Sequence, residues 1–262
     1  MLAVMNIRIY VTGPLAIEVE QNTVVDERRF RGRQSRVAFA YLAIERARPV
    51  GREELAEVLW PGDMPPSWDA ALSAVVSRLK SLLSAAKLDG LGFSILSGFG
   101  LYRMTVPADV WIDVEAAASA VDEAEAALRA GAMERILGLA TIATNICRRP
   151  FLPDYNGPWV EGQRERLARQ LVRALECHTQ MWLASGDAAL AVETAIEAVR
   201  LDPFRESAYR LLMRSYAASG NPADAVRAYL RLQTLLSEEL GATPSSETVA
   251  LYRQVSSVPP MR

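Results

Sequence analysis

The sequence predicts a mainly α-helical protein in two parts: small β-strands with three helices over residues 1–108, and an all-helical region over residues 109–262. Three observations lead to this prediction. Short alternating apolar stretches, broken by glycine and proline, open and close the first part. Helical periodicity fills almost all of the second part. Within it, Gly186 and Gly220 lie 34 residues apart, a spacing typical of repeats built from pairs of helices.

The first part begins with strands and continues with two helices. Loose alternation in NIRIYVTG and clear alternation in AIEVE predict short strands within residues 6–30. Apolar side chains at helical spacing then predict a helix over residues 34–46. A shorter helix over residues 52–59 follows, bounded by Pro-Val-Gly before it and Trp-Pro-Gly after it.

The third helix of this part shows the clearest apolar stripe. It covers residues 68–85, and its predicted buried face consists of Leu72, Val75, Val76, Leu79, Leu82 and Leu83. A hairpin should follow, with the strands GFSIL and LYRMTV on either side of a turn at residues 97–100. Strands, three helices and a terminal hairpin together predict a winged helix, in which one helix enters the major groove of DNA and the hairpin reaches an adjacent groove.

The outward face of the 68–85 helix has the side chains that a reader of DNA needs. Ser73 and Ser77 supply hydroxyl groups, and Arg78 and Lys80 supply charged donors, among small alanine and serine neighbours. An ordinary amphipathic surface helix is the alternative, and periodicity alone favours it.

The charge distribution adds one basic segment to this picture. Residues 1–108 carry a net charge of +2, from 13 Lys and Arg against 11 Asp and Glu, whereas the remainder carries −4, from 16 against 20. Residues 28–36, RRFRGRQSR, hold five arginines and no acidic residue. Such a segment suits contacts with phosphate groups, and the alternative is a solvated run of charge.

The second part contains a helical repeat. One copy follows the tetratricopeptide pattern closely, through Tyr209, Leu212, Tyr216, Ala225 and Tyr229. The large residues of this copy should lie mainly in the core. A degenerate copy precedes it, and residues 113–147 and 245–256 are predicted to form a further helix pair and a capping helix. Stacked helix pairs of this kind leave a concave groove, which usually binds a peptide, a helix or a neighbouring domain.

A segment rich in proline and aromatic residues, RPFLPDYNGPWV, interrupts the helices at residues 149–160. Two interpretations are open. The segment is either a loop that contacts a ligand or, as we favour, a packed connection with Phe151 and Trp159 anchored in the helical core.

Composition excludes several other classes of protein. Half of the residues are hydrophobic and 23% are charged, which is typical of globular proteins and not of disordered or fibrous ones. No apolar stretch approaches the roughly 20 residues that cross a bilayer, and the first residues lack the features of a signal peptide. Cys147 and Cys177 are too few for a disulfide framework. We therefore expect a cytoplasmic protein with reduced thiols and no membrane contact.

Motifs of catalysis and of metal or nucleotide binding do not occur in the sequence. There is no Walker loop, no zinc-ligand spacing and no supported catalytic triad, and His178, the only histidine, should pack structurally on a repeat helix. We therefore expect no enzymatic activity, no catalytic residues, no bound metal and no cofactor.

Two stretches of the chain resemble a known family of regulators. GRQSRVAFAYLAIERARPVGREELAEVLWPGDMPP and LSAVVSRLK resemble the OmpR-type winged helix of the actinobacterial antibiotic-pathway regulators (SARP). RRPFLPDYNGPWVEGQRERL and DPFRESAYRLLMRSYAASGNPADAVRAYLRLQTLLSEELGATPS resemble the bacterial transcriptional activator domain that follows it. The resemblance implies an activator that binds direct repeats in double-stranded promoter DNA, for a secondary-metabolite gene cluster. It also implies that the helical domain assists homodimerisation and contacts RNA polymerase.

The resemblance makes the 68–85 helix the recognition helix, places two arginines at the start of the first helix, and puts Arg103 on the hairpin. Together with the outward face of the recognition helix, it gives these candidate DNA contacts: Arg33, Arg36, Ser73, Ser77, Arg78, Lys80 and Arg103. Two features depart from the family pattern: Asp69 near the start of the recognition helix and Ser97 before the hairpin turn. With the small net charge of the first part, they leave a second hypothesis, a protein-interaction scaffold that does not bind DNA.

Overall fold

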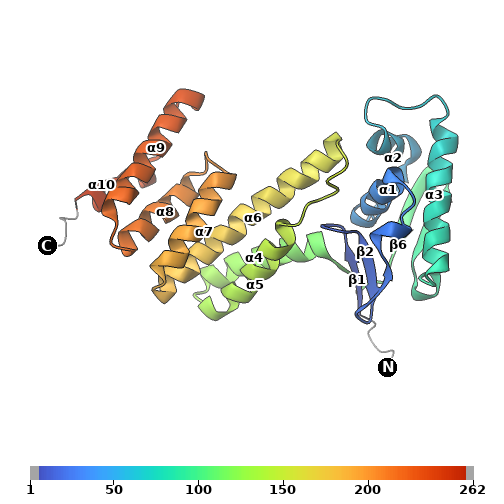
Figure 1. Ribbon diagram of the computed structural model, residues 1–262, viewed down its shortest axis with the longest axis horizontal. Helices are drawn as coiled ribbons and strands as arrows, with labels where there is room; N and C mark the ends of the chain where they lie inside the picture. The colour runs from blue at the N-terminus through green and yellow to red at the C-terminus, as the bar shows by residue number, and fades with distance from the viewer. Residues whose placement is uncertain (1–5, 258–262) are drawn as a thin grey trace. The chain divides into compact units, whose positions relative to one another are not determined.

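The computed structural model describes residues 6–257 and confirms the predicted fold class (Figure 1). Two small sheets and three helices occupy the first part of the chain, and the remainder is helical. Within residues 6–257 no helix is both long enough and apolar enough to cross a bilayer.

Contacts between residues divide the chain into two compact units. The N-terminal unit contains the residues up to Ala116 together with Arg149–Arg166, and the helical unit contains Ala117–Arg148 together with the residues from Leu167 onward. The predicted domain boundary between residues 108 and 109 stays a prediction. The second stretch of the N-terminal unit comes from the segment rich in proline and aromatic residues.

A four-stranded sheet begins the N-terminal unit. Its order is β3-β2-β1-β7, and its strands are β1 (Ile7–Tyr10), β2 (Ala16–Val19), β3 (Asn22–Val25) and β7 (Trp111–Ile112). β1 pairs antiparallel with β2, placing the buried Ile9 opposite the buried Ile17, and pairs parallel with β7. In β1, buried residues alternate with partly buried ones, as expected for a sheet with one face on the core.

The three predicted helices follow this sheet. They are α1 (Arg33–Ile44), α2 (Arg52–Leu59) and α3 (Trp68–Ala85), and α1 packs against both of the others. The second sheet has the order β4-β6-β5, with β4 (Val50–Gly51), β5 (Ser94–Gly98) and β6 (Leu101–Thr105). β5 and β6 form the predicted hairpin, and its loop residues Phe99 and Gly100 both have positive φ, 52° and 75°. A two-residue hairpin loop of type I′ requires positive φ at both of its central residues.

Asp113 connects the first sheet to the helix after it. The Asp113 carboxylate is fully buried and accepts hydrogen bonds from the backbone amides of Val11, Thr12 and Val114 and from the Thr12 hydroxyl. Burial raises the pKa of this carboxyl, and the four donors oppose the rise by stabilising the charged form.

The segment rich in proline and aromatic residues is packed, as predicted, but its packing partner corrects the prediction. Phe151 forms a bridge with Thr12, Trp159 meets the ring of Tyr41 at a centroid distance of 4.9 Å, and the Tyr155 hydroxyl donates to the Val58 carbonyl oxygen at 2.6 Å. Phe151 and Trp159 thus pack in the N-terminal unit and not in the helical core. The sequence showed anchoring aromatics but could not show which of two apolar cores receives them.

The rest of the described chain is helical, and consecutive helices from residue 188 onward pack against one another. Its helices are α4 (Asp113–Arg129), α5 (Met133–Cys147), α6 (Pro158–Ser185), α7 (Ala188–Leu201), α8 (Glu206–Ala218), α9 (Pro222–Leu240) and α10 (Ser246–Ser256). The predicted pair over 113–147 and the terminal helix over 245–256 are confirmed. Gly186 and Gly220 end α6 and α8 with φ of 83° and 77°, so their 34-residue spacing reflects two helix ends that need a left-handed residue.

The core of the helical unit agrees with the repeat pattern. Tyr209, Leu212 and Tyr229 are buried, whereas Tyr216 is only half-buried. Both cysteines are buried and form no disulfide, and burial raises the pKa of Cys177 to about 11. His178 is also buried, which lowers its pKa, and it lies 3.3 Å from the Thr141 hydroxyl.

Candidate nucleic-acid interface

Helix α3 presents an exposed face of small and polar side chains. Its buried stripe, Leu72, Val75, Val76, Leu79 and Leu83, packs within the N-terminal unit and so fixes which side faces outward. Ser73, Ser77, Arg78 and Lys80 are exposed on that outward side. Small neighbours leave room for another molecule to approach the helix backbone closely.

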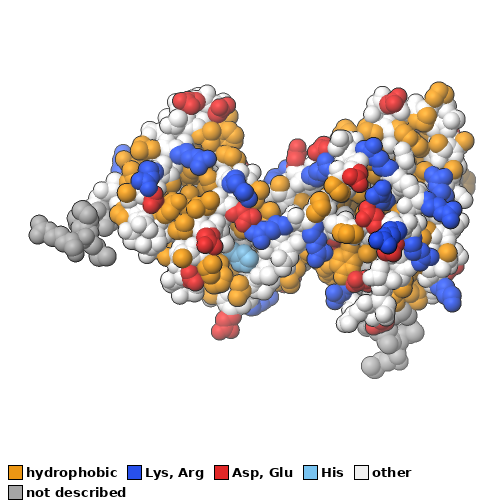
Figure 2. Space-filling model, in the orientation of Figure 1, with side chains coloured by type: hydrophobic (Ala, Val, Ile, Leu, Met, Phe, Trp, Pro, Cys, Tyr) orange, Lys and Arg blue, Asp and Glu red, His pale blue; other side chains and the backbone are white. Residues whose placement is uncertain are grey.

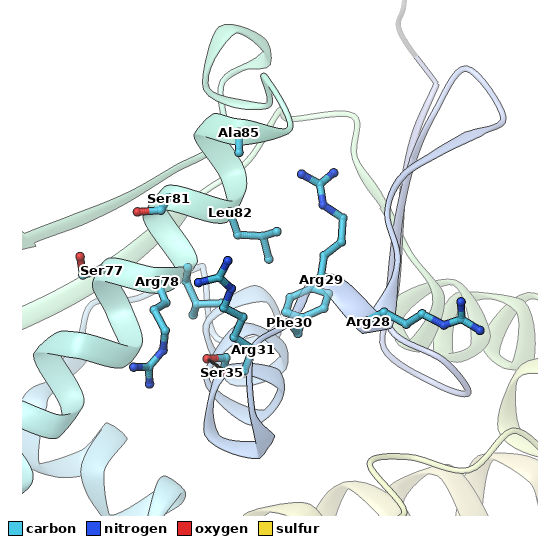
Figure 3. Close-up of a pocket in the computed structure, with 11 residues that line it drawn as sticks. Arg28, Arg29, Phe30, Arg31, Ser35, Ser77, Arg78, Ser81, Leu82 and Ala85 are labelled. Carbon is cyan, nitrogen blue, oxygen red and sulfur yellow. Dashed lines mark hydrogen bonds between the residues drawn. The ribbon is translucent and has the colours of Figure 1, made fainter.

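A hollow of about 520 Å³ lies beside this face, where a segment distant in sequence meets α3 (Figure 3). Arg28 and Arg29 belong to a single 3₁₀ turn (Glu27–Arg29), which Phe30 and Arg31 follow. Ser77, Arg78, Ser81 and Leu82 of α3 form the other side. Figure 3 shows Leu82 pointing toward the hollow, and Arg28 at its outer edge pointing away from α3. Four arginines thus line one concave surface, and the guanidinium group of Arg28 is directed outward from it.

Three of these four arginines are without side-chain partners. Arg29 donates to the Val24 carbonyl oxygen at 2.5 Å. The side chains of Arg28, Arg31 and Arg78 make no hydrogen bond, ion pair or ring contact with any described residue. Unpaired guanidinium groups around a hollow attract an anion, and their planar fork of donors matches a phosphate group.

An arginine of α2 neutralises Asp69, the acidic residue of α3. Nε and Nη2 of Arg52 lie 2.9 and 2.5 Å from Asp69 Oδ1, and Nη2 also donates to the Ser73 hydroxyl at 2.9 Å. Asp69 therefore does not present a free negative charge at the start of the helix. Ser73 is exposed, but its hydroxyl already accepts a hydrogen bond from Arg52. The exposed Ser77 hydroxyl makes no such bond with a described residue and is therefore more available to another molecule.

The hairpin lies beside the end of the same helix. Lys80 Nζ donates to the Ser97 hydroxyl at 2.8 Å, which links α3 to β5. Arg103 is exposed on β6, and its side chain contacts no described residue. At the tip, Phe99 has a relative exposure of 106%, and Leu96 and Leu101 beside it are also exposed. A fully exposed aromatic ring at positive φ is costly for folding alone, and a contact with another molecule would explain it.

Arg33 and Arg36 have partners within the N-terminal unit. The Arg33 guanidinium lies over the Tyr155 ring, 4.6 Å from its centroid. Arg36 forms an ion pair with Glu27 at 2.8 Å and a longer one with Asp154 at 3.8 Å. The structure therefore places Ser77 and Arg78 at the hollow. Lys80 and Arg103 lie at the hairpin. Arg33 and Arg36 line a separate, smaller depression.

Acidic side chains of the unit are mostly held by internal partners. Arg48 and Tyr41 both donate to Glu54 at 2.5 Å, and the arginine hydrogen bond, the largest cause, lowers the Glu54 pKa to about 2. Burial, aided by Glu54, raises the pKa of Tyr41 to about 12. On the face drawn in Figure 2, basic and acidic side chains are interspersed over the surface. The net charge of the surface therefore does not indicate where an interface lies. The more useful indication is which individual charged side chains have internal partners and which do not.

The sequence indicated the basic run at residues 28–36, but the candidate DNA contacts within it were Arg33 and Arg36. Arg28, Arg29 and Arg31 were part of RRFRGRQSR, yet only a fold brings them to Ser77 and Arg78. Among residues 6–257 no three His, Cys, Asp or Glu side chains are grouped as metal ligands would be.

Comparison with known proteins supports a regulatory role. The sequence model of the bacterial transcriptional activator domain matches residues 112–256, more than half of the chain. The chain belongs to the bacterial transcriptional activator domain family. This assignment confirms the family resemblance found in the helical part.

Two transcriptional regulators match this chain in sequence over most of its length. The transcriptional regulatory protein EmbR of Mycobacterium tuberculosis is 30% identical over 224 residues, which are 85% of this chain and 57% of EmbR. The chain thus spans little more than half of that relative. The transcriptional regulatory protein MoaR1 of the same organism is 25% identical over 232 residues, 87% of this chain and 73% of MoaR1. Both are named as regulators and not as enzymes, in agreement with the expectation from the sequence.

A solved structure shares the fold over nearly the whole chain. EmbR from Mycobacterium tuberculosis, in complex with a low-affinity phosphopeptide, superposes with a TM-score of 0.83 at 25% sequence identity. The match covers 98% of this chain and 67% of the EmbR chain. The fold of both units therefore recurs in a transcriptional regulator.

Proposed function

We propose that this protein is a DNA-binding transcriptional regulator whose N-terminal unit binds promoter DNA through α3, the basic hollow and the β5–β6 hairpin. The observation that carries the proposal is the hollow. Arg28, Arg31 and Arg78 come from segments about 50 residues apart in the sequence and line one concave surface, and their side chains have no partner among residues 6–257. Phosphate contacts fix a protein on DNA, and exposed polar side chains of a neighbouring helix read base edges.

Each part of the surface has a distinct role in this proposal. Arg28, Arg29 and Arg31 contact the phosphate backbone, and Ser77 and Arg78 read bases in the major groove. Lys80, held by Ser97, couples the orientation of α3 to the hairpin. Arg103 and Phe99 contact the adjacent groove from the hairpin. Ser73, Arg33 and Arg36 support the surface through Arg52, Tyr155 and Glu27, and contact DNA only if these bonds exchange.

The helical unit carries the activating role in this proposal. The family match and the resemblance together support an activator that binds direct repeats as a homodimer, contacts RNA polymerase through the helical unit, and acts in the cytoplasm. Control of a secondary-metabolite gene cluster has the support of the sequence resemblance alone.

Titration against DNA from upstream of neighbouring genes tests DNA binding. Fluorescence anisotropy at two salt concentrations should show saturable binding of the full chain to at least one upstream fragment, with weaker and more salt-sensitive binding to random DNA. Equal, weak binding to every duplex, or none, would favour the alternative of a scaffold that does not read DNA.

Activation is tested by damaging only the helical unit. Leu212 is buried in α8, and replacing a buried leucine with alanine costs about 2–5 kcal/mol. The Leu212→Ala variant should keep its DNA footprint and lose reporter expression. Loss of both together would mean that the helical unit contributes chiefly to dimerisation.

A further inference from the structure

The helical unit has a groove that DNA binding does not explain. Its volume is about 440 Å³, and side chains of α7, α8 and α9 line it. This volume lies within the range of sites that hold small molecules or single side chains of a partner. Residues of three consecutive helices converge there because the repeat stacks α7 on α8 and α8 on α9.

Positive charge dominates the groove. Arg200, Arg227 and Arg231 line it together with one acid, Asp224. Arg227 forms an ion pair with Asp224. The exposed side chains of Arg200 and Arg231 make no hydrogen bond or ion pair with any described residue. Two guanidinium groups therefore remain available to an anion.

Tyr209 gives the second, independent observation. It lines the same groove with a relative exposure of 0%, and its buried hydroxyl has no hydrogen-bond partner in the described part of the chain. Tyr209 and Arg231 line the groove together; burial raises the pKa of this phenol, and the charge of Arg231 opposes the rise. Buried hydroxyl groups normally have a partner. A neutral phenol beside a guanidinium is a pair of donors that lacks an acceptor.

The apolar lining defines the rest of the ligand. Ile196 is 45% exposed, and Tyr216 is half-buried. An apolar side chain next to the anion would cover both. This favours a peptide over DNA, because a phosphate backbone offers no apolar group and a duplex is too broad to reach a hydroxyl beneath the surface.

We propose that the groove between α7, α8 and α9 binds an acidic peptide segment of a partner protein. One side-chain carboxylate accepts hydrogen bonds from Arg200, Arg231 and the Tyr209 hydroxyl, once a shift of the surrounding side chains exposes that hydroxyl. An adjacent apolar side chain of the peptide packs on Ile196 and Tyr216. The site does not depend on DNA binding by the N-terminal unit.

The test uses a fluorescein-labelled peptide of alternating leucine and aspartate, blocked at both termini, with the full-length protein. A second peptide carries asparagine in place of aspartate. Anisotropy should show that the acidic peptide binds at least tenfold more tightly than the asparagine peptide, because hydrogen bonds to charged groups are the strong ones. Arg231→Gln and Arg200→Gln should each lower the affinity for the acidic peptide by about tenfold. Arg214→Gln, an exposed arginine of α8 outside the groove, should leave it unchanged.

Tyr209→Phe separates the proposed contact from general attraction of charge. This substitution keeps the ring and removes the unpartnered hydroxyl, so the melting temperature should stay the same or rise. The affinity for the acidic peptide should fall severalfold, because one hydrogen bond to the carboxylate is lost. The proposal is overturned if both peptides bind equally or not at all, or if Arg214→Gln weakens binding as much as Arg231→Gln. It is also overturned if Arg200→Gln and Arg231→Gln reduce affinity for duplex DNA and spare the peptide.

Discussion

Two pairs of arginines in the basic run make different predictions for binding to DNA. Arg28 and Arg31 line the hollow, and no described residue contacts their side chains through a hydrogen bond, ion pair or ring. By contrast, Arg33 lies on Tyr155 and Arg36 is paired with Glu27. The double variants Arg28→Gln with Arg31→Gln, and Arg33→Gln with Arg36→Gln, remove the same net charge. Only the first pair is free to neutralise phosphates, so the structure predicts unequal effects.

The magnitude follows from counterion release. Each lost phosphate contact lowers the slope of log K against log salt by about 0.9, so losing two contacts lowers it by about 1.8. For a fourfold rise in salt, the parent protein should then lose about twelve times more affinity than the Arg28/Arg31 variant does. The Arg33/Arg36 variant should keep nearly the parental slope.

Anisotropy titrations of the three proteins against one duplex, at four or more salt concentrations, give the slopes directly. The Arg28/Arg31 variant should retain the parental melting temperature. The Arg33/Arg36 variant should lose little stability, because ion pairs and a cation–π contact at the surface contribute about 0–1 kcal/mol each. An unchanged slope in the Arg28/Arg31 variant, with a fall in the Arg33/Arg36 variant, would refute the reasoning and place DNA at the start of α1.

Three further substitutions test other parts of the N-terminal unit. Arg78→Ala should remove about 1–3 kcal/mol of discrimination at one base position, measured on a set of single-base variants of the site; an even loss across sequences would make Arg78 a phosphate contact. Phe99→Asn should hold or raise the melting temperature, since asparagine tolerates positive φ, and should weaken DNA binding; unchanged affinity would exclude the hairpin tip from the interface. Glu54→Gln tests the pH dependence of stability. The folded-state pKa of Glu54 is about 2 against an ordinary 4.5, so its contribution is complete above about pH 4.5 and is lost as the pH falls toward 2. The melting temperatures of parent and variant should therefore converge over that window, and a constant difference would contradict the assignment.

Local patterns in the sequence were sufficient to predict most of the fold. The predicted helices over 52–59 and 68–85 match α2 and α3 residue for residue, because each has a continuous apolar stripe and a clear break at both ends. The segment at 149–160 shows the limit of such patterns. Its aromatic residues had to be buried, but the receiving core is set by contacts such as Phe151 with Thr12, more than a hundred residues away.

The candidate site was less predictable than the fold, for a reason that Arg36 and Arg31 illustrate. Both belong to one basic run, and nothing local distinguishes them. Arg36 follows α1 around to the side where Glu27 and Asp154 lie, and its charge is neutralised there. Arg31 precedes α1 and lies beside α3, where no described acid meets its side chain. Arg52 and Asp69 show the same effect in reverse, since an acid that appears unfavourable for DNA binding is paired by an arginine 17 residues earlier. The electrostatics of the surface therefore depend on which charges remain unpaired after folding, and this is a property of tertiary packing that composition and net charge do not contain.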